Sequence, residues 1–199
     1  GAGDATGRLP LTLNGTRVLF DTIPAPILFV SKGQINVIVP YGVAGKASSV
    51  VKITTGGVSV SSTVSIATSM PALFTYDGSG KGQIAALNPD FTVNSPSNPA
   101  PRGSIVVLYA TGAGAFDKTF PDGQILAADI AYPTAGVWVR FSKLPGDILY
   151  AGTAPFLVNG ALQVNVKLPA DLIPGTEVPI QLIVGSWTSP PGTTISVAN

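Results

Sequence analysis

The sequence contains no cysteine and no histidine, and only 11% of its 199 residues are charged. The missing residue types exclude disulfides, thiolate nucleophiles, Ser-His and Cys-His triads, and most zinc or copper sites. The 11 Lys and Arg and the 10 Asp and Glu leave a net charge of +1. That balance offers no electrostatic footprint for nucleic acid or for an anionic membrane, so we expect neither as a partner.

Long apolar runs are absent as well. No stretch approaches the roughly 18 residues of a membrane-spanning helix, and the first residues lack the basic-then-apolar start of a signal peptide. We therefore expect no membrane insertion and, if the protein is exported, a signal that has already been removed.

Glycine and proline are plentiful. The 23 Gly and 18 Pro make up about one residue in five, which disfavours long helices. Hydrophobic residues, at 45%, are ample for a packed core. Short runs rich in Val, Ile, Leu, Phe and Thr alternate with turn residues, a pattern typical of an all-β protein. The expected strands are 17–21, 25–30, 35–39, 49–54 and 63–67 in the first half and 105–111, 136–141, 147–151, 162–168, 178–184 and 194–197 in the second.

The second half of the chain repeats the first. The run QINVIVP at 34–40 recurs as QVNVKLP 129 residues later, and VSIA at 64–67 matches ISVA at 195–198. Upstream, ILF at 27–29 matches ILY at 148–150, so the second copy carries an insertion around 153–160. We therefore predict two homologous domains, 1–76 and 103–199, each the size of a small β-sandwich. Residues 77–102, dense in Gly, Asn, Ser and Pro, are predicted to form an extended connector.

Many of these runs are similar to a family of repeated domains at the C-termini of exported proteins of Solibacter-type acidobacteria. The similarity rests on RVLFD at 17–21, PAPILFVS at 24–31, GQIN at 33–36, VPY at 39–41, GQ at 82–83, ALN at 86–88, NS at 94–95, NPA at 98–100, RGS at 102–104, YATG at 109–112 and LQVNV at 162–166. The resemblance implies two tandem immunoglobulin-like β-sandwich domains, export, and an extracellular or cell-surface location. It offers no catalytic residues to carry over.

One departure from the family pattern is informative. Members normally begin with a strand of the kind seen at 103–112, GSIVVLYATG, whereas the first copy starts at residues 1–5, which align with the residues after that strand. The first domain is therefore expected to lack its leading strand. The loss would empty part of its core and leave unpaired main-chain groups along a sheet edge, which favours strand addition from another chain.

Three explanations for the missing strand remain open at this point. The strand lies upstream in a longer protein, or Leu9, Leu11 and Leu13 fill the gap from within the chain, although Pro10 cannot donate a ladder hydrogen bond. In the third explanation a neighbouring subunit completes the domain, and head-to-tail repetition of that contact builds a polymer.

No arrangement of residues predicts catalysis, a cofactor or a metal ion. The run GSGKG at 78–82 lacks the spacing of a phosphate-binding loop. Asp117, Asp122, Asp129 and Asp147 do not fall in a calcium-binding loop, and the carboxylates show no motif typical of a glycosidase pair. We therefore expect a protein that is not an enzyme, with no catalytic, cofactor-binding or metal-binding residues.

Aromatic side chains are the remaining candidates for binding. Trp187 lies in an expected hairpin tip, where an exposed ring would suit a partner or a sugar face. Trp138 and Tyr150 lie within expected strands, which favours a core role for both.

The sequence thus predicts a non-enzymatic extracellular structural subunit that assembles with copies of itself into a filament or surface layer by β-strand complementation. The alternative is a carbohydrate- or surface-binding adhesive module of a larger secreted protein, with a polysaccharide as partner. The candidate assembly and binding residues are Leu9, Leu11, Leu13 and Trp187.

Overall fold

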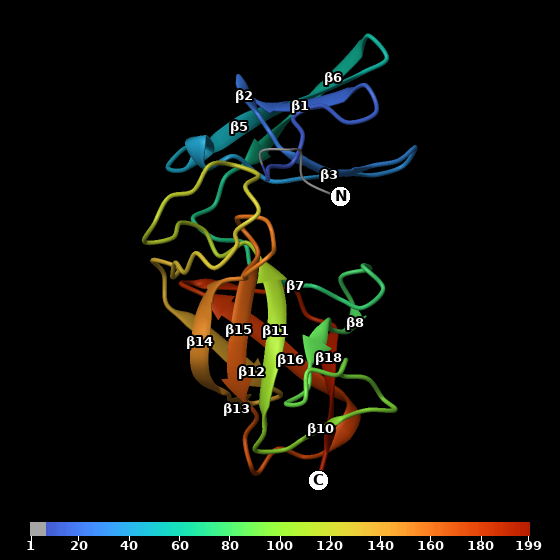
Figure 1. Ribbon diagram of the computed structural model, residues 1–199, viewed down its shortest axis with the longest axis vertical. Coiled ribbons are helices and arrows are strands. Elements are labelled where there is room, and N and C mark those ends of the chain that lie inside the picture. Colours follow the sequence, from blue (N-terminus) through green and yellow to red (C-terminus); the bar gives the residue numbers. More distant parts are fainter. Residues whose placement is uncertain (1–6) are drawn as a thin grey trace. The chain divides into compact units, whose positions relative to one another are not determined.

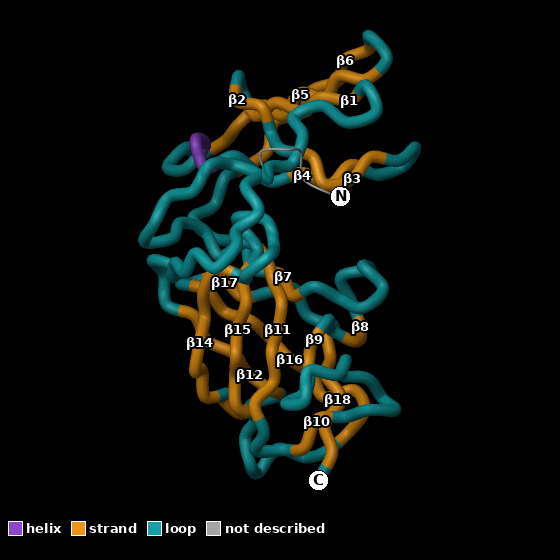
Figure 2. The backbone as a smooth tube through the Cα atoms, in the orientation of Figure 1, coloured by secondary structure: helices purple, strands orange, loops and turns teal. Residues whose placement is uncertain are grey.

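The computed structural model describes residues 7–199 and is all-β, with several mainly antiparallel sheets consistent with a β-sandwich (Figure 1, Figure 2). The one helical element among these residues is a 3-10 turn, η1 (Tyr41–Val43). Within this range no helix has the length and apolar character needed to cross a membrane. The strands are β1 (Thr16–Phe20), β2 (Ile23–Pro24), β3 (Ile27–Val30), β4 (Ile35–Val37), β5 (Ser48–Thr55), β6 (Val58–Ser65), β7 (Ala72–Leu73), β8 (Gly82–Gln83), β9 (Ala86–Leu87), β10 (Ala100–Pro101), β11 (Ile105–Thr111), β12 (Val137–Phe141), β13 (Leu144–Pro145), β14 (Asp147–Thr153), β15 (Leu162–Lys167), β16 (Gly175–Val184), β17 (Trp187–Thr188) and β18 (Thr193–Ala198).

The chain forms two compact units, and the structure divides it at other points than the repeat in the sequence suggests. Unit 1 combines Gly1–Thr68 with Lys118–Asp129 and Pro155–Gly160, and unit 2 combines Ser69–Asp117, Ile130–Ala154 and Ala161–Asn199. A sequence pattern is read along the chain, whereas a compact unit gathers segments that are distant in sequence. Residues 1–5, which align with the segment after the missing strand, lie outside the described residues.

Unit 1 is built from a four-stranded sheet, with the order β2-β1-β5-β6, and a separate hairpin, β3-β4. Along β1 buried and more exposed residues alternate, as expected of a strand with one face on a core. The core is a small cluster that partly buried side chains from β3, β4 and β5 extend. Its buried members are Val18, Phe20, Ala25, Ile27 and Val43.

The two later segments of unit 1 contribute to its packing. Leu126 is buried, and its N–H donates to the Leu157 carbonyl at 2.9 Å. Asp122 Oδ1 accepts a hydrogen bond of 3.0 Å from the Tyr41 N–H. Burial, with a smaller contribution from the charge of Asp122, raises the pKa of Tyr41 to about 12. The insertion that the repeat indicates around 153–160 therefore supplies part of unit 1.

Unit 2 has two larger sheets. One has the order β10-β18-β16-β12-β13, with β17 on β16 and β8 on β18; the other has the order β14-β15-β11-β7, with β9 on β11. Strand β11 lies beside β15 and pairs with it antiparallel over its length (Figure 1). Alternate side chains on both strands are fully buried, among them Val106, Leu108, Val164 and Val166.

The residues 77–102 belong to unit 2, where the sequence predicts an extended connector. Strands β8 and β10 run parallel to β18, and β9 pairs with β11. We call residues 82–111, which contain β8, β9, β10 and β11, the closing segment. Much of its first part is fixed by side-chain amides rather than by long ladders of main-chain hydrogen bonds. Strands β8, β9 and β10 have two residues each, which is too short for recognition from hydrophobic alternation.

Candidate functional site

Within residues 7–199, strand β4 of unit 1 has an open edge where its counterpart in unit 2 has a neighbouring strand. Strand β15 pairs with β14 on one side and with β11 on the other. Among residues 7–199, β4 pairs with β3 alone (Figure 2). The repeat aligns Ile35 and Val37 of β4 with Val164 and Val166 of β15. The β15 residues are fully buried, whereas Ile35 and Val37 are only partly buried.

The open edge of β4 presents main-chain hydrogen-bonding groups. The Ile38 N–H donates to the Pro26 carbonyl at 2.9 Å, so the main chain at residue 38 faces the β3 side. Alternate residues of an antiparallel strand face opposite edges. The N–H and C=O groups of Ile35 and Val37 therefore face away from β3, and they form a template for an added strand.

Strand β6 is the second open edge. All eight residues of β6 are exposed, and on its outer side no strand from the described part of the chain pairs with it. Its register with β5 places Val60 opposite Ile53 and Val64 opposite Ser49, on the face that the core of unit 1 uses. Val64 is 36% exposed, whereas Ile195, its counterpart 131 residues later, is 0% exposed. Unit 1 therefore lacks the cover that unit 2 gives to the same position.

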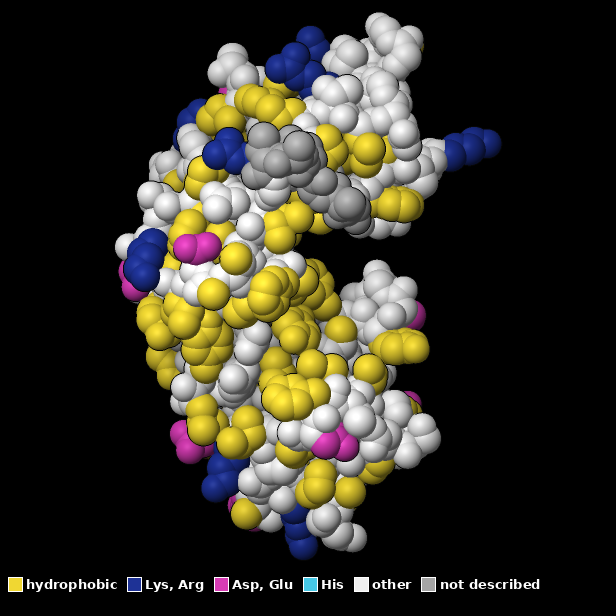
Figure 3. Space-filling model, viewed as in Figure 1, with side chains coloured by type: hydrophobic (Ala, Val, Ile, Leu, Met, Phe, Trp, Pro, Cys, Tyr) yellow, Lys and Arg dark blue, Asp and Glu magenta, His cyan; other side chains and the backbone are white. Residues whose placement is uncertain are grey.

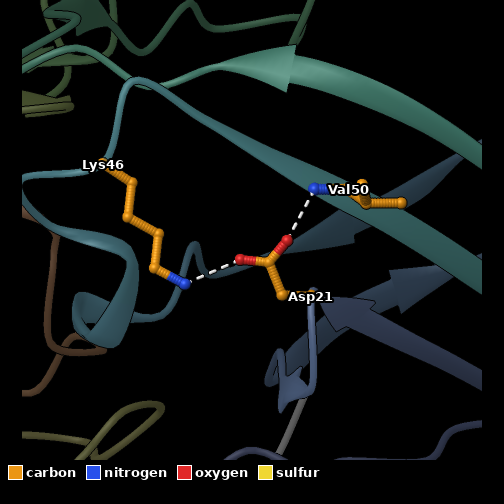
Figure 4. Close-up of polar contacts among 3 residues, drawn as sticks. All are labelled: Asp21, Lys46 and Val50. Atoms are coloured by element: carbon orange, nitrogen blue, oxygen red, sulfur yellow. Dashed lines mark hydrogen bonds and ion pairs between the residues drawn. The ribbon is translucent and has the colours of Figure 1, made fainter.

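Hydrogen bonds between Asp21 and Val50, which we call the Asp21 corner, show which main-chain groups of β6 point outward. The Asp21 N–H donates to the Val50 carbonyl at 2.8 Å. Asp21 Oδ1 accepts from the Val50 N–H, also at 2.8 Å (Figure 4). The main chain of Val50 thus faces away from β6. Because Val50 pairs with Thr63, the main chain of Thr63 faces away from β5, and by alternation so does that of Ser65.

The same corner gives unit 1 a dependence on pH. Lys46 Nζ lies 2.7 Å from Asp21 Oδ2. That hydrogen bond, and then the one from the Val50 main chain, lower the pKa of Asp21 from its ordinary value of 3.8. A lowered pKa adds stability above the ordinary pKa, and the contribution is lost as the pH falls through the pKa of the folded state. Unit 1 is therefore expected to lose stability in acid below pH 3.8.

The measurement compares the wild-type protein with Asp21→Asn, because asparagine tolerates the positive φ of 55° at this position. The difference in stability of unit 1 should be constant above the ordinary pKa of 3.8 and should shrink below it. A difference that does not change with pH would contradict this assignment.

A groove of about 530 Å³ opens between the four-stranded sheet and the β3-β4 hairpin. Thr16 and Ile53 line it from the sheet, Val30 and Ile35 line it from the hairpin, and Lys32 lies in the turn of the hairpin. Val30, Ile35 and Ile53 give the groove apolar surface, and the rest of its lining is mostly polar. An incomplete sandwich has such a groove, because the space between its sheets is not filled by its own strands.

Within residues 7–199 the leucines proposed as an internal filler do not cover the edge of β4, although Leu13 packs against the core of unit 1. Leu9 is buried, and its N–H donates to the Gly123 carbonyl at 2.9 Å. The Ile27 N–H donates to the Pro10 carbonyl at 2.8 Å, which places this stretch beside β3. Leu11 is exposed, and Leu13 forms a bridge with Thr16. Within the described residues, then, the stretch 9–13 forms no pairing with the open edge of β4.

The two tryptophans do not share a face of unit 2. Trp138 pairs with Ile183, and Trp187 pairs with Val184. Ile183 and Val184 are consecutive in β16 and point to opposite faces of the sheet, so their partners do too. Trp138 is 54% exposed and Trp187 is 43% exposed. The core role favoured for Trp138 is therefore wrong: its ring lies on the outer face of β12. Trp187 is partly exposed at the hairpin, beside a buried partner.

Charge and ionisable groups are sparse. On the face drawn in Figure 3, Lys, Arg, Asp and Glu side chains are scattered among uncharged ones. Within residues 7–199, no three carboxylates gather closely enough to hold a metal ion. The chemical features that stand out in unit 1 are therefore main-chain edges and apolar surface.

Sequence reasoning missed two groups of residues at this site. The exposed valines of β6 alternate with serine as in any strand, and nothing in that alternation distinguishes a covered face from an uncovered one. Asn94 of the closing segment lies in a stretch that the sequence predicts to be a polar connector, although its side chain is buried. Amide residues spaced between short apolar runs, as in Gln83, Asn88 and Asn94, were the available signal.

No protein-family model matches the chain, and no curated protein sequence matches it. The similarity to repeated domains of exported acidobacterial proteins therefore stays a prediction.

Proposed function

We propose that the protein is a non-enzymatic extracellular structural subunit with two immunoglobulin-like units, of which unit 1 is completed by a β-strand from a neighbouring subunit. Repetition of that contact would build a filament or surface layer. The observation that carries the proposal is the open edge of β4, whose counterpart β15 is covered by β11. Export and family membership enter only through the resemblance of the sequence.

The energetics favour occupancy of this edge. In unit 2, Val106 and Leu108 of β11 are fully buried, and each large apolar side chain contributes about 1.5–3 kcal/mol when buried. Unit 1 lacks an equivalent contribution, which is a large share of the roughly 5–15 kcal/mol that stabilises a typical domain. A donated strand would supply this burial together with main-chain hydrogen bonds to Ile35 and Val37.

The low charge of the chain also supports assembly. Only 11% of the residues are charged, and β6 carries no charged side chain. Subunits that pack side by side therefore have few like charges to repel one another. Natural edge strands are often protected by lysine or proline, and β6 has neither.

The first test uses a peptide with the sequence of residues 103–112, which contains β11, the strand that has no counterpart beside β4 among the described residues. We expect it to bind unit 1 and, at about 100 times its Kd, to stabilise that unit by about 2.7 kcal/mol, a rise in Tm of roughly 10–20 °C. Hydrogen exchange along β4 is the measurement, because both tryptophans lie in unit 2 and their fluorescence does not report on unit 1.

A matched pair of variants at Val37 separates main-chain pairing from simple apolar contact. Val37→Pro removes the N–H that faces the open edge, whereas Val37→Ala keeps it while removing much of the side chain. Peptide binding should persist in Val37→Ala and be lost in Val37→Pro. No protection of β4 at saturating peptide would overturn the proposal.

Native sizing tests the assembly itself. The chain has a mass of 20.2 kDa, and the proposal expects species far larger than that, or fibres that pellet, from protein purified without denaturant. A clean monomer at all concentrations would rule out a polymer of this chain.

A further inference from the structure

Unit 2 shows what normally covers the outer edge of the strand that corresponds to β6. Its strand β18 pairs in parallel with both β8 and β10, through the contacts Thr193↔Gly82 and Ala100↔Val197. The Ile84 N–H also donates to the Thr194 carbonyl at 2.9 Å. These contacts come from the first part of the closing segment, so one continuous stretch of chain covers β18 and then crosses to β15 as β11.

An asparagine holds that stretch in place. Asn94 is 0% exposed, and its side chain forms hydrogen bonds with both the N–H and the carbonyl group of Ser196. The Ser196 N–H donates to Asn94 Oδ1 at 3.0 Å, and Asn94 Nδ2 donates to the Ser196 carbonyl at 2.8 Å. Gln83 Nε2 donates to Asn94 Oδ1 at 2.8 Å, and Asn94 Nδ2 donates to Asn88 Oδ1 at 2.9 Å. All hydrogen-bonding capacity of the buried amide is thereby used.

Strand β6 presents the same groups on its open edge. The repeat aligns Ser65 with Ser196 and Thr63 with Thr194. The Ile66 N–H donates to the Ala47 carbonyl at 3.0 Å, so residue 66 faces β5 and the main chain of Ser65 faces outward by alternation. This agrees with the orientation derived from the Asp21 corner. Ser65 therefore offers an N–H and a C=O in the direction in which Ser196 meets Asn94.

Strand β6 and the first part of the closing segment both carry little charge. Strand β6 contains only Val, Ser and Thr, and residues 82–101 carry Asp90 as their only charge. A segment of the closing type can thus meet β6 without burying a charge, which would be costly. The exposed valines of β6 would gain the cover that Ile195 already has.

We propose that the segment donated to unit 1 resembles the closing segment and covers both open edges, and we call it the clasp. It runs parallel to β6, forms hydrogen bonds to the main chain of Ser65 through an asparagine side chain, and then crosses to pair antiparallel with β4. The inference rests on the proposed function, because it specifies the partner that completes unit 1. The donor is a segment of this type that is free to pair. In the described structure the chain's own closing segment is paired inside unit 2.

Three peptides test the clasp: residues 103–112, residues 82–112, and residues 82–112 with Asn94→Ala. The long peptide can form additional hydrogen bonds with β6, so it should bind unit 1 at least about tenfold more tightly than the short one. The Asn94→Ala peptide should lose most of that gain. Hydrogen exchange should show new protection at Thr63 and Ser65 with the long peptide only, and at β4 with both wild-type peptides.

Two protein variants provide the matched control. Ser65→Pro removes the outward N–H that the asparagine would use, and it should abolish the advantage of the long peptide while the short peptide still binds. Ser65→Ala keeps the main chain and should retain most of that advantage. Protection at β18 is followed in parallel, because a long peptide that exchanged into unit 2 would change β18 rather than β6.

The outcomes separate the two proposals. If both peptides protect β4 with equal affinity and β6 stays unprotected, the clasp is wrong and strand completion at β4 stands. If neither peptide protects unit 1, both proposals fail. If the long peptide and its Asn94→Ala version bind with equal affinity, the asparagine does not hold the main chain of Ser65 and that part of the proposal is wrong.

Discussion

Replacing Asn94 with alanine is expected to lower the free energy of unfolding of unit 2 by about 3–5 kcal/mol. Asn94 is 0% exposed and bonds to Gln83, Asn88 and both main-chain groups of Ser196. Alanine would leave several buried partners unsatisfied, and each unsatisfied group costs roughly 1–3 kcal/mol. The loss would be large against the whole stability of a domain.

Tryptophan fluorescence during denaturant unfolding measures this effect directly, because Trp138 and Trp187 both lie in unit 2. Asn98→Ala is the matched control: Asn98 bonds to Thr92 and Val93 but is exposed, so water can replace its partners. We expect a loss below about 1 kcal/mol there. Similar losses for Asn94→Ala and Asn98→Ala would show that the buried network does not hold the closing segment.

The second large effect is an asymmetry between corresponding positions of the two units. Ile195→Ala should cost about 2–5 kcal/mol, the usual range for a large aliphatic side chain deleted from a packed core, because Ile195 is 0% exposed. Val64→Ala should cost less than about 0.5 kcal/mol, as for surface substitutions. The repeat aligns these residues, so the contrast isolates the cover that unit 1 lacks.

Fluorescence follows unit 2 for Ile195→Ala, and hydrogen exchange of β5 and β6 follows unit 1 for Val64→Ala. The proposed completion adds a conditional result: with the long peptide bound, Val64→Ala should weaken binding, because Val64 is then buried. A cost above 2 kcal/mol for Val64→Ala in the free protein would mean that this face of β6 is covered without a partner.

The expected strands agree with the structure where hydrophobic alternation is long. The ranges 105–111, 162–168 and 194–197 correspond closely to β11, β15 and β18. Alternation reports a strand with one buried face, and these strands have it. Gly56 and Gly57 form the turn between β5 and β6, and both adopt the positive φ that glycine permits in a tight hairpin turn.

Prediction is weakest where side chains rather than main-chain ladders make the contacts. The first part of the closing segment contains the two-residue strands β8, β9 and β10, and its composition predicts an extended connector. Its fixed position depends on Asn94 meeting Ser196, a contact across 102 residues of sequence. No local pattern contains information about a partner so far away along the chain.

For the open edges too, the sequence predicts one part and only the structure reveals the other. The missing counterpart of β11 follows from comparing the two copies of the repeat, so the gap beside β4 is a prediction of the sequence. The role of Leu9 is not, because Leu9 is buried against Gly123, which belongs to a later segment of unit 1. Exposure of β6 also depends on what lies opposite it.

The amino-acid order alone thus determined the all-β class and the match between the two copies of the repeat, because each follows from patterns only a few residues long. Only the tertiary structure decided that residues 118–129 and 155–160 join unit 1, that an asparagine in an apparent linker is buried, and that the valines of β6 are uncovered. Burial and hydrogen-bond satisfaction are properties of pairs of segments brought together by folding, and a single segment does not encode its partner.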